Sequence, residues 1–168
     1  MDIARTARLL LRTVTLDDAP FYLALVNDPQ FIAHIGQRHI HSLAASRAAL
    51  ADGPIAMQAK FGHALYTVTL AADATAVGMC GLIKRGTLPD VDLGYAFLPQ
   101  FRGQGYAFEA AAAMLAHARA LGLPRLMAIA SPGNLASIGL LRKLGMVFVE
   151  TRSFEPGDPG TSIYTMDL

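Results

Sequence analysis

Two glycines, Gly103 and Gly105, stand between an apolar run and an alanine-rich run, and this layout suits the binding of an anionic group. The apolar run, 91–98, is typical of a β-strand, and the run after Gly105, 107–121, repeats apolar residues at helical spacing. The first N–H groups of a helix have no partner within the helix, and the helix dipole favours negative charge there. The segment therefore predicts a phosphate site, although glycines suit a plain strand-to-helix turn equally well.

Two common nucleotide-binding patterns do not fit this segment. A dinucleotide-binding fingerprint would need a third glycine where Phe108 stands. A P-loop would need Lys followed by Ser or Thr after its last glycine, and the chain has Tyr106 and Ala107 there. The predicted anion site therefore belongs to neither class.

The segment Gln100-x-x-Gly103-x-Gly105, with Arg102 before the first glycine, resembles the acetyl-CoA pyrophosphate motif of the GNAT superfamily of N-acetyltransferases. Other segments resemble further GNAT signatures in the expected order: Thr6–Arg12, Asp92–Tyr95, Asn134-x-x-Ser137 and Lys143–Met146. Together they span nearly the whole chain. They resemble the branch that contains the ribosomal-protein alanine N-acetyltransferases.

The resemblance implies that acetyl-CoA is the co-substrate, and it assigns residues to its binding. The main chain from Arg102 to Ala107 would hold the pyrophosphate, and Arg102 would either add charge or face solvent. The pantetheine arm would pair with 96–98 like an added strand, and an N–H near Phe97 or Leu98 would polarise the thioester carbonyl. Asn134 would cap the last helix and contact the arm. The implied cofactor residues are Phe97, Leu98, Arg102, Gly103, Gln104, Gly105, Tyr106, Ala107 and Asn134.

Acetyl transfer also needs a neutral amine and a departing thiolate. Asp92 aligns with a position that is often acidic in the resembled branch, so it is the first candidate for the base, although a carboxylate beside Asp90 in a turn is usually solvated. Tyr66, Tyr95 and His63 are weaker candidates, each equally well explained as a strand residue.

Ser137 is the candidate for hydrogen bonding to the leaving sulfur. Many GNAT members use a tyrosine three to four positions after this serine, but Leu140 and Leu141 occupy those positions here. Alternatively, the Ser137 hydroxyl bonds only to its own helix.

Composition narrows the possible partners. The formal net charge is +1, and neither half of the chain has the basic excess of a nucleic-acid-binding domain, so we expect no nucleic-acid partner. The longest weakly polar stretch contains Glu109, His117 and Arg119, so we expect no membrane span. The single Cys80 fits a reducing cytoplasm, and an apolar content of 53% leaves a homodimer open.

The segment 30–41 contains His34, His39 and His41 without a cysteine or carboxylate nearby, so we expect no metal site. In the resembled family the early helices wall the acceptor groove. The segment is therefore a candidate for acceptor specificity.

The pattern predicts one α/β (α+β) domain, residues 1–168, with a mixed, mostly antiparallel sheet of six to seven strands and about four helices. Short links make the strands at about 62–70, 77–85 and 91–98 antiparallel, and the long helix after Gly105 allows 125–130 to lie parallel to 91–98. Other strands are expected at 8–14, 146–152 and 161–168. Other helices are expected from a capping-box-like start, Thr15-x-x-Asp18, to before Pro29, at 43–51 with 52–54 as its closing turn, and at about 134–144.

The resulting hypothesis is an acetyl-CoA-dependent N-acetyltransferase that acts by direct attack in a ternary complex. Its acceptor would be a primary amine, either a protein N-terminus or a small molecule. The alternative is a non-catalytic acyl-CoA-binding or sensing module, which would keep the glycine motif without the leaving-group tyrosine.

Overall fold

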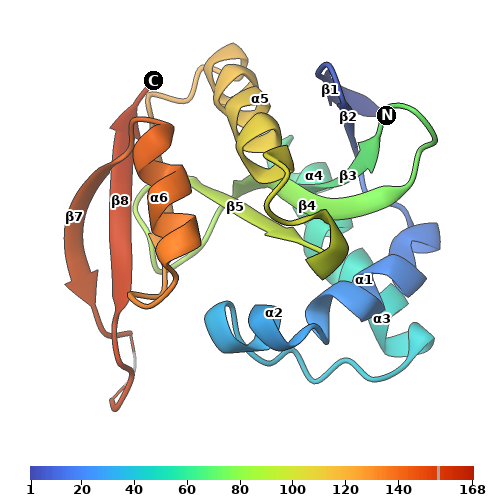
Figure 1. Ribbon diagram of the computed structural model, residues 1–168, viewed down its shortest axis with the longest axis horizontal. Helices are drawn as coiled ribbons and strands as arrows, with labels where there is room; N and C mark the ends of the chain where they lie inside the picture. Colours follow the sequence, from blue (N-terminus) through green and yellow to red (C-terminus); the bar gives the residue numbers. More distant parts are fainter. Residues whose placement is uncertain (155) are drawn as a thin grey trace.

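The computed structural model describes residues 1–154 and 156–168, whose eight strands form one open sheet flanked by helices (Figure 1). The sheet order is β1-β2-β3-β4-β5-β6-β8-β7. The strands are β1 (Asp2–Arg5), β2 (Leu9–Arg12), β3 (Leu65–Leu70), β4 (Ala76–Ile83), β5 (Asp92–Phe97), β6 (Arg125–Ala130), β7 (Val147–Arg152) and β8 (Thr161–Asp167). The expected α/β class with a mixed, mostly antiparallel sheet is confirmed, and β1 adds one strand at the edge.

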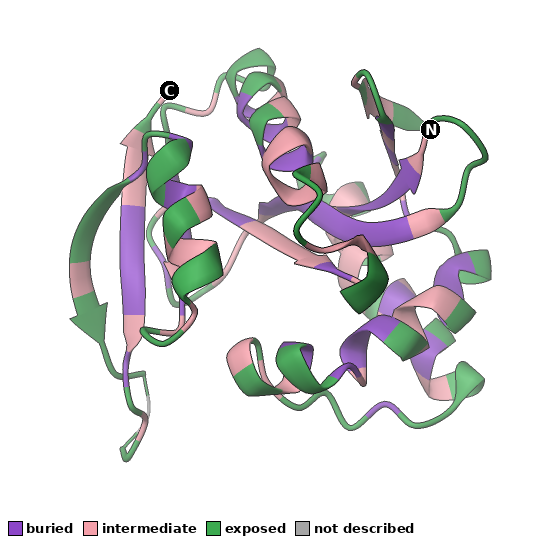
Figure 2. Ribbon diagram, in the orientation of Figure 1, coloured by how far each residue is buried: buried purple, intermediate pink, exposed green. Residues whose placement is uncertain are grey.

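The helices divide between the two faces of the sheet. They are α1 (Ala19–Val26), α2 (Pro29–His34), α3 (Leu43–Leu50), α4 (Ala56–Phe61), α5 (Tyr106–Ala120) and α6 (Leu135–Lys143), with short helical segments η1 (Leu16–Asp18), η2 (Ala51–Ile55) and η3 (Pro99–Phe101). A large core lies under α5 and α6, where Met114 and Leu141 are fully buried. A second core joins α1, α2 and α3 to Met79 of β4. Figure 2 shows that β4 is buried at the centre of the sheet, whereas β7 is largely exposed at its edge.

Two helical elements differ from the sequence prediction because proline was read as a stop. Pro29 begins α2, where a missing N–H has no consequence, and Asp28 caps this helix by accepting the Phe31 N–H at 2.9 Å. The segment predicted as a closing turn, 52–54, instead forms part of the π-helical η2, which contains Pro54 and continues into α4. The segment between β2 and β3 is therefore more helical than expected.

The sheet opens between β5 and β6. These strands are parallel, as expected, but their register contains only Asp92 opposite Met127, and the Met127 N–H donates to Val91 O at 2.9 Å. On its other edge β5 stays paired with β4 as far as Phe97. The Leu98 N–H donates to Val77 O on that side, at 3.0 Å. Because main-chain direction alternates along an antiparallel strand, the main-chain groups of Tyr95 and Phe97 point toward the opening.

Candidate active site

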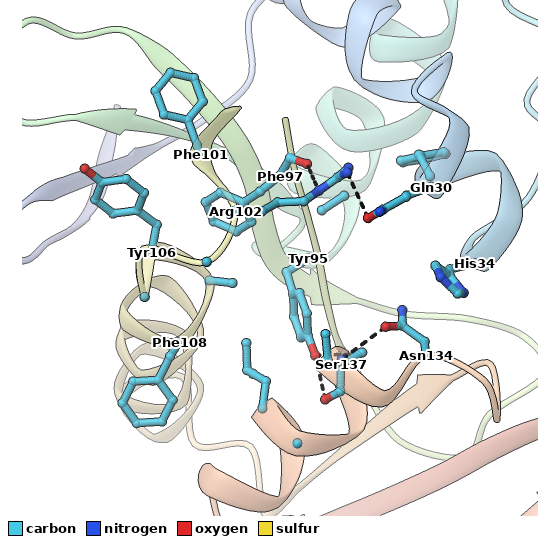
Figure 3. A pocket seen from close by; sticks show the side chains of 18 of the residues that line it. Gln30, His34, Tyr95, Phe97, Phe101, Arg102, Tyr106, Phe108, Asn134 and Ser137 are labelled. Atoms are coloured by element: carbon cyan, nitrogen blue, oxygen red, sulfur yellow. Dashed lines mark hydrogen bonds between the residues drawn. The ribbon is translucent and has the colours of Figure 1, made fainter. Parts of the chain in front are cut away.

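A cavity of about 380 Å³ occupies the opening between β5 and β6. Figure 3 shows its walls, which come from β5, from α2, from the turn that begins α5, and from α6. These elements are distant in sequence and meet only because β6 diverges from β5. The cavity is therefore a product of the fold, and its residues can be compared with those predicted from sequence.

The glycine turn forms one end of this cavity. Gly103 and Gly105 have φ values of +71° and +82°, a left-handed conformation that glycine adopts without steric cost. Gly105 is the N-cap residue of α5, and the first residues of α5, Tyr106 and Ala107, line the cavity with both glycines. A Cβ atom on Gly103 would meet nothing within 4 Å, which leaves open space beside the main chain. The turn thus offers helix N-terminal N–H groups to a ligand.

The Gln104 side chain belongs to the turn but not to the cavity wall. Its amide donates to Gln100 O at 2.9 Å, so it holds the turn together instead. Leu98 also lies outside the wall: its N–H is bonded to Val77, and its side chain packs against the second core. Phe97 lines the cavity, so of the two residues proposed to polarise a carbonyl, Phe97 is the one in place.

The Arg102 guanidinium lines the cavity, but protein groups already surround it. Its Nε donates to Phe97 O at 2.9 Å, and its two Nη groups donate to Gln30 Oε1 at 3.0 Å and to Asp28 Oδ2 at 2.5 Å. Burial of the Asp28 carboxylate works to raise its pKa, but hydrogen bonds from Arg102 and from the Phe31 N–H outweigh it, so the pKa of Asp28 is lowered. Arg102 therefore ties the end of β5 to α2.

Asn134 and Ser137 lie at the start of α6, as predicted. Asn134 Oδ1 accepts the Ser137 N–H at 3.1 Å, which makes Asn134 the cap of this helix. The Ser137 hydroxyl lies 2.7 Å from the Tyr95 hydroxyl, and both side chains line the cavity (Figure 3). Burial raises the pKa of Tyr95 to about 12, with the Ser137 hydrogen bond acting in the opposite direction. Tyr95 is therefore a neutral phenol at physiological pH and can donate to Ser137.

Asp92 does not line the cavity. Its carboxylate is buried and accepts Arg85 Nε at 2.9 and 3.1 Å. Burial raises the pKa of Asp92, and the charge and hydrogen bond of Arg85 act against this. Alternation along β5 also puts Asp92 on the face opposite Tyr95. The structure does not bring the predicted base together with Ser137.

His34 is a cavity residue that the sequence did not single out for chemistry. It ends α2, and its Nδ1 lies 3.1 Å from Ser131 Oγ, in the turn between β6 and α6. In the sequence it has no feature that distinguishes it from His39 or His41. The contact between Arg102 and Asp28 was equally hidden, because 74 positions separate the two residues.

Two remaining predictions concern a metal site and a membrane span. Across residues 1–154 and 156–168 no group of three or more His, Cys, Asp or Glu side chains could hold a metal ion. No helix in this described part is long and apolar enough to cross a membrane. Cys80 is fully buried, and burial raises the pKa of its thiol, so it is not a reactive nucleophile.

Solved structures of similar fold include an acetyltransferase from Agrobacterium tumefaciens str. C58, 26% identical, with a TM-score of 0.82 over 98% of this chain and 94% of that chain. Another is RimL, described as a ribosomal L7/L12 alpha-N-protein acetyltransferase in complex with coenzyme A, 16% identical. Its TM-score is 0.77 over 100% of this chain and 98% of that chain. At this level of identity, the second likeness shows the fold alone.

Sequence comparison gives the family. A curated relative, the uncharacterized N-acetyltransferase YnaD of Bacillus subtilis (strain 168), is 36% identical over 56 residues, which span 33% of this chain and 33% of that protein. The match to that relative thus covers about a third of its length. The Acetyltransferase (GNAT) domain family matches residues 8–147, which is most of the sequence and includes the glycine turn, β5 and Ser137. The chain therefore belongs to the GNAT acetyltransferase family.

Proposed function

We propose that this protein transfers the acetyl group of acetyl-CoA to a primary amine by direct attack in a ternary complex. The observation that carries the proposal is the cavity itself. It joins a glycine turn at the start of α5 to the open main-chain edge of β5 and to the Tyr95–Ser137 pair. Each part matches one requirement of acetyl transfer from a thioester.

The chemistry of the cavity fits acetyl-CoA. The pyrophosphate would accept N–H groups from the glycine turn, where Gly103 leaves the main chain open. Lys143 lines the same cavity and adds positive charge beside Phe108, above whose ring its Nζ lies at 4.3 Å. The pantetheine arm would run along β5, where the main-chain groups of Tyr95 and the Phe97 N–H point into the opening, while the Phe97 carbonyl is already bonded to Arg102. Asn134 lies at the opposite wall, within reach of the arm.

Two groups would assist the chemical step. As an amine attacks the thioester, negative charge develops on the carbonyl oxygen, and the Phe97 N–H would donate to it. When the C–S bond breaks, the Ser137 hydroxyl would donate to the leaving sulfur. The Tyr95 hydroxyl stays protonated and lies 2.7 Å from Ser137 Oγ and 3.3 Å from the Ser137 carbonyl oxygen. In this proposal it would donate to Ser137 Oγ, which would leave the serine proton free to point into the cavity. The Tyr95–Ser137 pair would thus take the role of the tyrosine that many GNAT members carry where this chain has Leu140 or Leu141.

For the acceptor we propose a protein N-terminal α-amine, with a small-molecule amine as the other choice. Support comes from the likeness to RimL, which is described as an alpha-N-protein acetyltransferase. Asp92 remains a prediction as the base, and because Arg85 holds its carboxylate, it would have to act through water.

One observation favours a second candidate, a non-catalytic acyl-CoA-binding module. None of the described residues that line the cavity carries a carboxylate, the commonest base besides histidine. Such a module would bind acetyl-CoA without releasing thiol. Turnover therefore separates the two candidates, and binding does not.

The test combines thiol release from acetyl-CoA with a calorimetric titration. Peptides that begin with alanine, serine or methionine would be compared with polyamines and free amino acids. Acceptor-dependent thiol release is the expected result, and the preferred acceptor would name the substrate class. Binding without release on every acceptor would favour the binding module, whereas absence of binding would overturn the acetyl-CoA assignment.

A further inference from the structure

We propose that His34 is the catalytic base that removes a proton from the acceptor ammonium. The inference rests on the proposed acetyl transfer, and it assigns the acceptor end of the same cavity. It also moves the predicted proton acceptor from Asp92, outside the cavity, to a side chain within it.

Position is the first argument. Figure 3 shows the glycine turn with Tyr106 at one end of the cavity and His34 at the other, with Tyr95 and Ser137 between them. A pyrophosphate bound at the turn, as proposed, would put the thioester near Tyr95 and Ser137. The amine must then approach from the side that remains, which is the α2 wall. His34 lies on that wall, next to the opening between β5 and β6.

The surroundings of the ring are the second argument. Ser131 Oγ lies 3.1 Å from Nδ1 of His34, and we assign Nδ1 as the donor, which leaves the lone pair on Nε2 for the amine. Ser131 belongs to the turn that positions the leaving-group side, since its carbonyl accepts the Asn134 N–H at 2.9 Å. Asn134 in turn holds Ser137. One turn thus fixes both the proposed base and the proposed acid.

Two of the other titratable groups of the cavity, Tyr95 and Arg102, are unsuited to this role. The titratable groups that line it with His34 are Tyr95, Arg102, Tyr106 and Lys143. Burial raises the pKa of Tyr95 to about 12, so its phenolate is rare at neutral pH. The Arg102 guanidinium is permanently protonated and bonded to Asp28. Imidazole is in general the side chain that exchanges a proton near neutral pH.

The protons of this step can be accounted for with His34, Ser137 and water. His34 Nε2 takes one proton from the ammonium, and the neutral nitrogen attacks the thioester carbon, forming the N–C bond. Collapse breaks the C–S bond, and the electron pair leaves with sulfur. Sulfur takes a proton from Ser137, and the second nitrogen proton replaces it through water. The imidazolium releases its proton to solvent, so the products are an amide, a thiol and one proton.

The experiment compares His34→Gln with wild type in pH profiles of kcat/KM, using the best acceptor of the panel. General base catalysis contributes roughly a hundredfold or more, so His34→Gln should lose about that factor at pH 7. The gap should narrow as pH rises toward the pKa of the acceptor, because the free amine then forms without a base. The affinity for acetyl-CoA, measured by calorimetry, should stay within about twofold.

Two variants serve as comparisons. His41→Gln removes an exposed imidazole of the same segment outside the cavity and should match wild type. Asp92→Asn tests the rival base. The proposal is overturned if His34→Gln keeps more than half of the wild-type kcat/KM at pH 7, or if its loss of kcat/KM does not change with pH. It is also overturned if Asp92→Asn, and not His34→Gln, removes the fall of kcat/KM at low pH. If wild type itself binds acetyl-CoA but turns over no acceptor, the proposed function fails first and His34 loses its role with it.

Discussion

The two ends of the cavity are built from different materials. The proposed acetyl-CoA end consists mainly of main chain: the glycine turn, the first residues of α5 and the outward edge of β5. The proposed acceptor end consists of side chains, such as His34 and Gln30, which project from α2. A main-chain site requires glycines at fixed spacing and leaves a sequence signature. A side-chain site built across distant elements leaves none.

The variant with the largest expected effect on the main-chain end is Gly105→Val. The residue has φ of +82°, and a Cβ there would lie 3.3 Å from an Arg8 guanidinium nitrogen, so the turn that presents the N–H groups must distort. We expect acetyl-CoA affinity to fall by about a hundredfold, or about 2.7 kcal/mol, in calorimetric titration. Gly122→Val is the matched control, because φ is +72° there with open space around it, at the other end of α5. If both variants lost similar acetyl-CoA affinity, the loss would come from general backbone strain and not from the turn itself.

The next effect concerns how the start of α1, on the proposed acceptor side, is anchored to the sheet. Asp18 is buried just before α1 and accepts hydrogen bonds from Arg12 of β2, Thr67 of β3 and the Thr15 N–H. Asp18→Asn removes the charge that Arg12 needs, so we expect the free energy of unfolding to fall by about 2 kcal/mol in urea denaturation. Acetyl-CoA affinity of the folded protein should not change. An equal loss of affinity would mean that the two ends are not independent.

The Arg12–Asp18 pair also predicts how the free energy of unfolding depends on pH. Burial works to raise the pKa of Asp18, but hydrogen bonds from Arg12, Thr15 and Thr67 outweigh it, so the folded pKa is lowered. A group with a lowered pKa stabilises the fold above its unfolded value, about 3.9, and that contribution is lost as pH falls through the folded value. The stability difference between wild type and Asp18→Asn should therefore be constant from pH 5 to 7 and shrink below about pH 4. A difference that grows on acidification would contradict the sign.

Sequence predicted the elements whose signals are local. Apolar spacing after Gly105 predicted α5, observed as Tyr106–Ala120, and short links predicted the antiparallel run of β3, β4 and β5. Asn134 was predicted as the cap of the last helix because its role needs only its own helix, and it is observed there. Local patterns carry such information because the hydrogen bonds involved join residues a few positions apart.

Sequence missed the features that depend on long-range contacts. Tyr95 and Ser137 are 42 positions apart, so their hydrogen bond could not be read from either motif. Pro29 begins a helix where the sequence predicts a helix end, because proline both ends helices and favours their first position, and only the packing of α2 decides between the two. The motif position that makes Asp92 a candidate base carries no information on its contact with Arg85.

A smaller effect tests the middle of the cavity, where the two ends meet. Ser137→Ala removes the proposed donor to sulfur, and Tyr95→Phe removes the group that orients it. A thiolate is already a tolerable leaving group, so we expect kcat to fall only about tenfold in each variant, with KM for acetyl-CoA nearly unchanged. Because the hydroxyls act as one unit, the double variant should be little worse than either single one. If the kcat losses of the two single variants instead multiply in the double variant, the two hydroxyls have separate roles.

The smallest effect tests the contact that joins the two ends, Arg102 with Asp28. Asp28→Asn weakens the bond that positions α2 relative to β5, while the amide keeps an oxygen to cap Phe31. We expect KM for the acceptor to rise about threefold, a loss of about 0.6 kcal/mol, with acetyl-CoA affinity unchanged, since the glycine turn itself is intact.

The control is Glu150→Gln, which breaks an exposed pair with Arg152 far from the cavity and should alter neither constant. If Asp28→Asn instead weakened acetyl-CoA binding and spared the acceptor, Arg102 would belong to the main-chain end, and the division of the cavity into two ends would have to be redrawn.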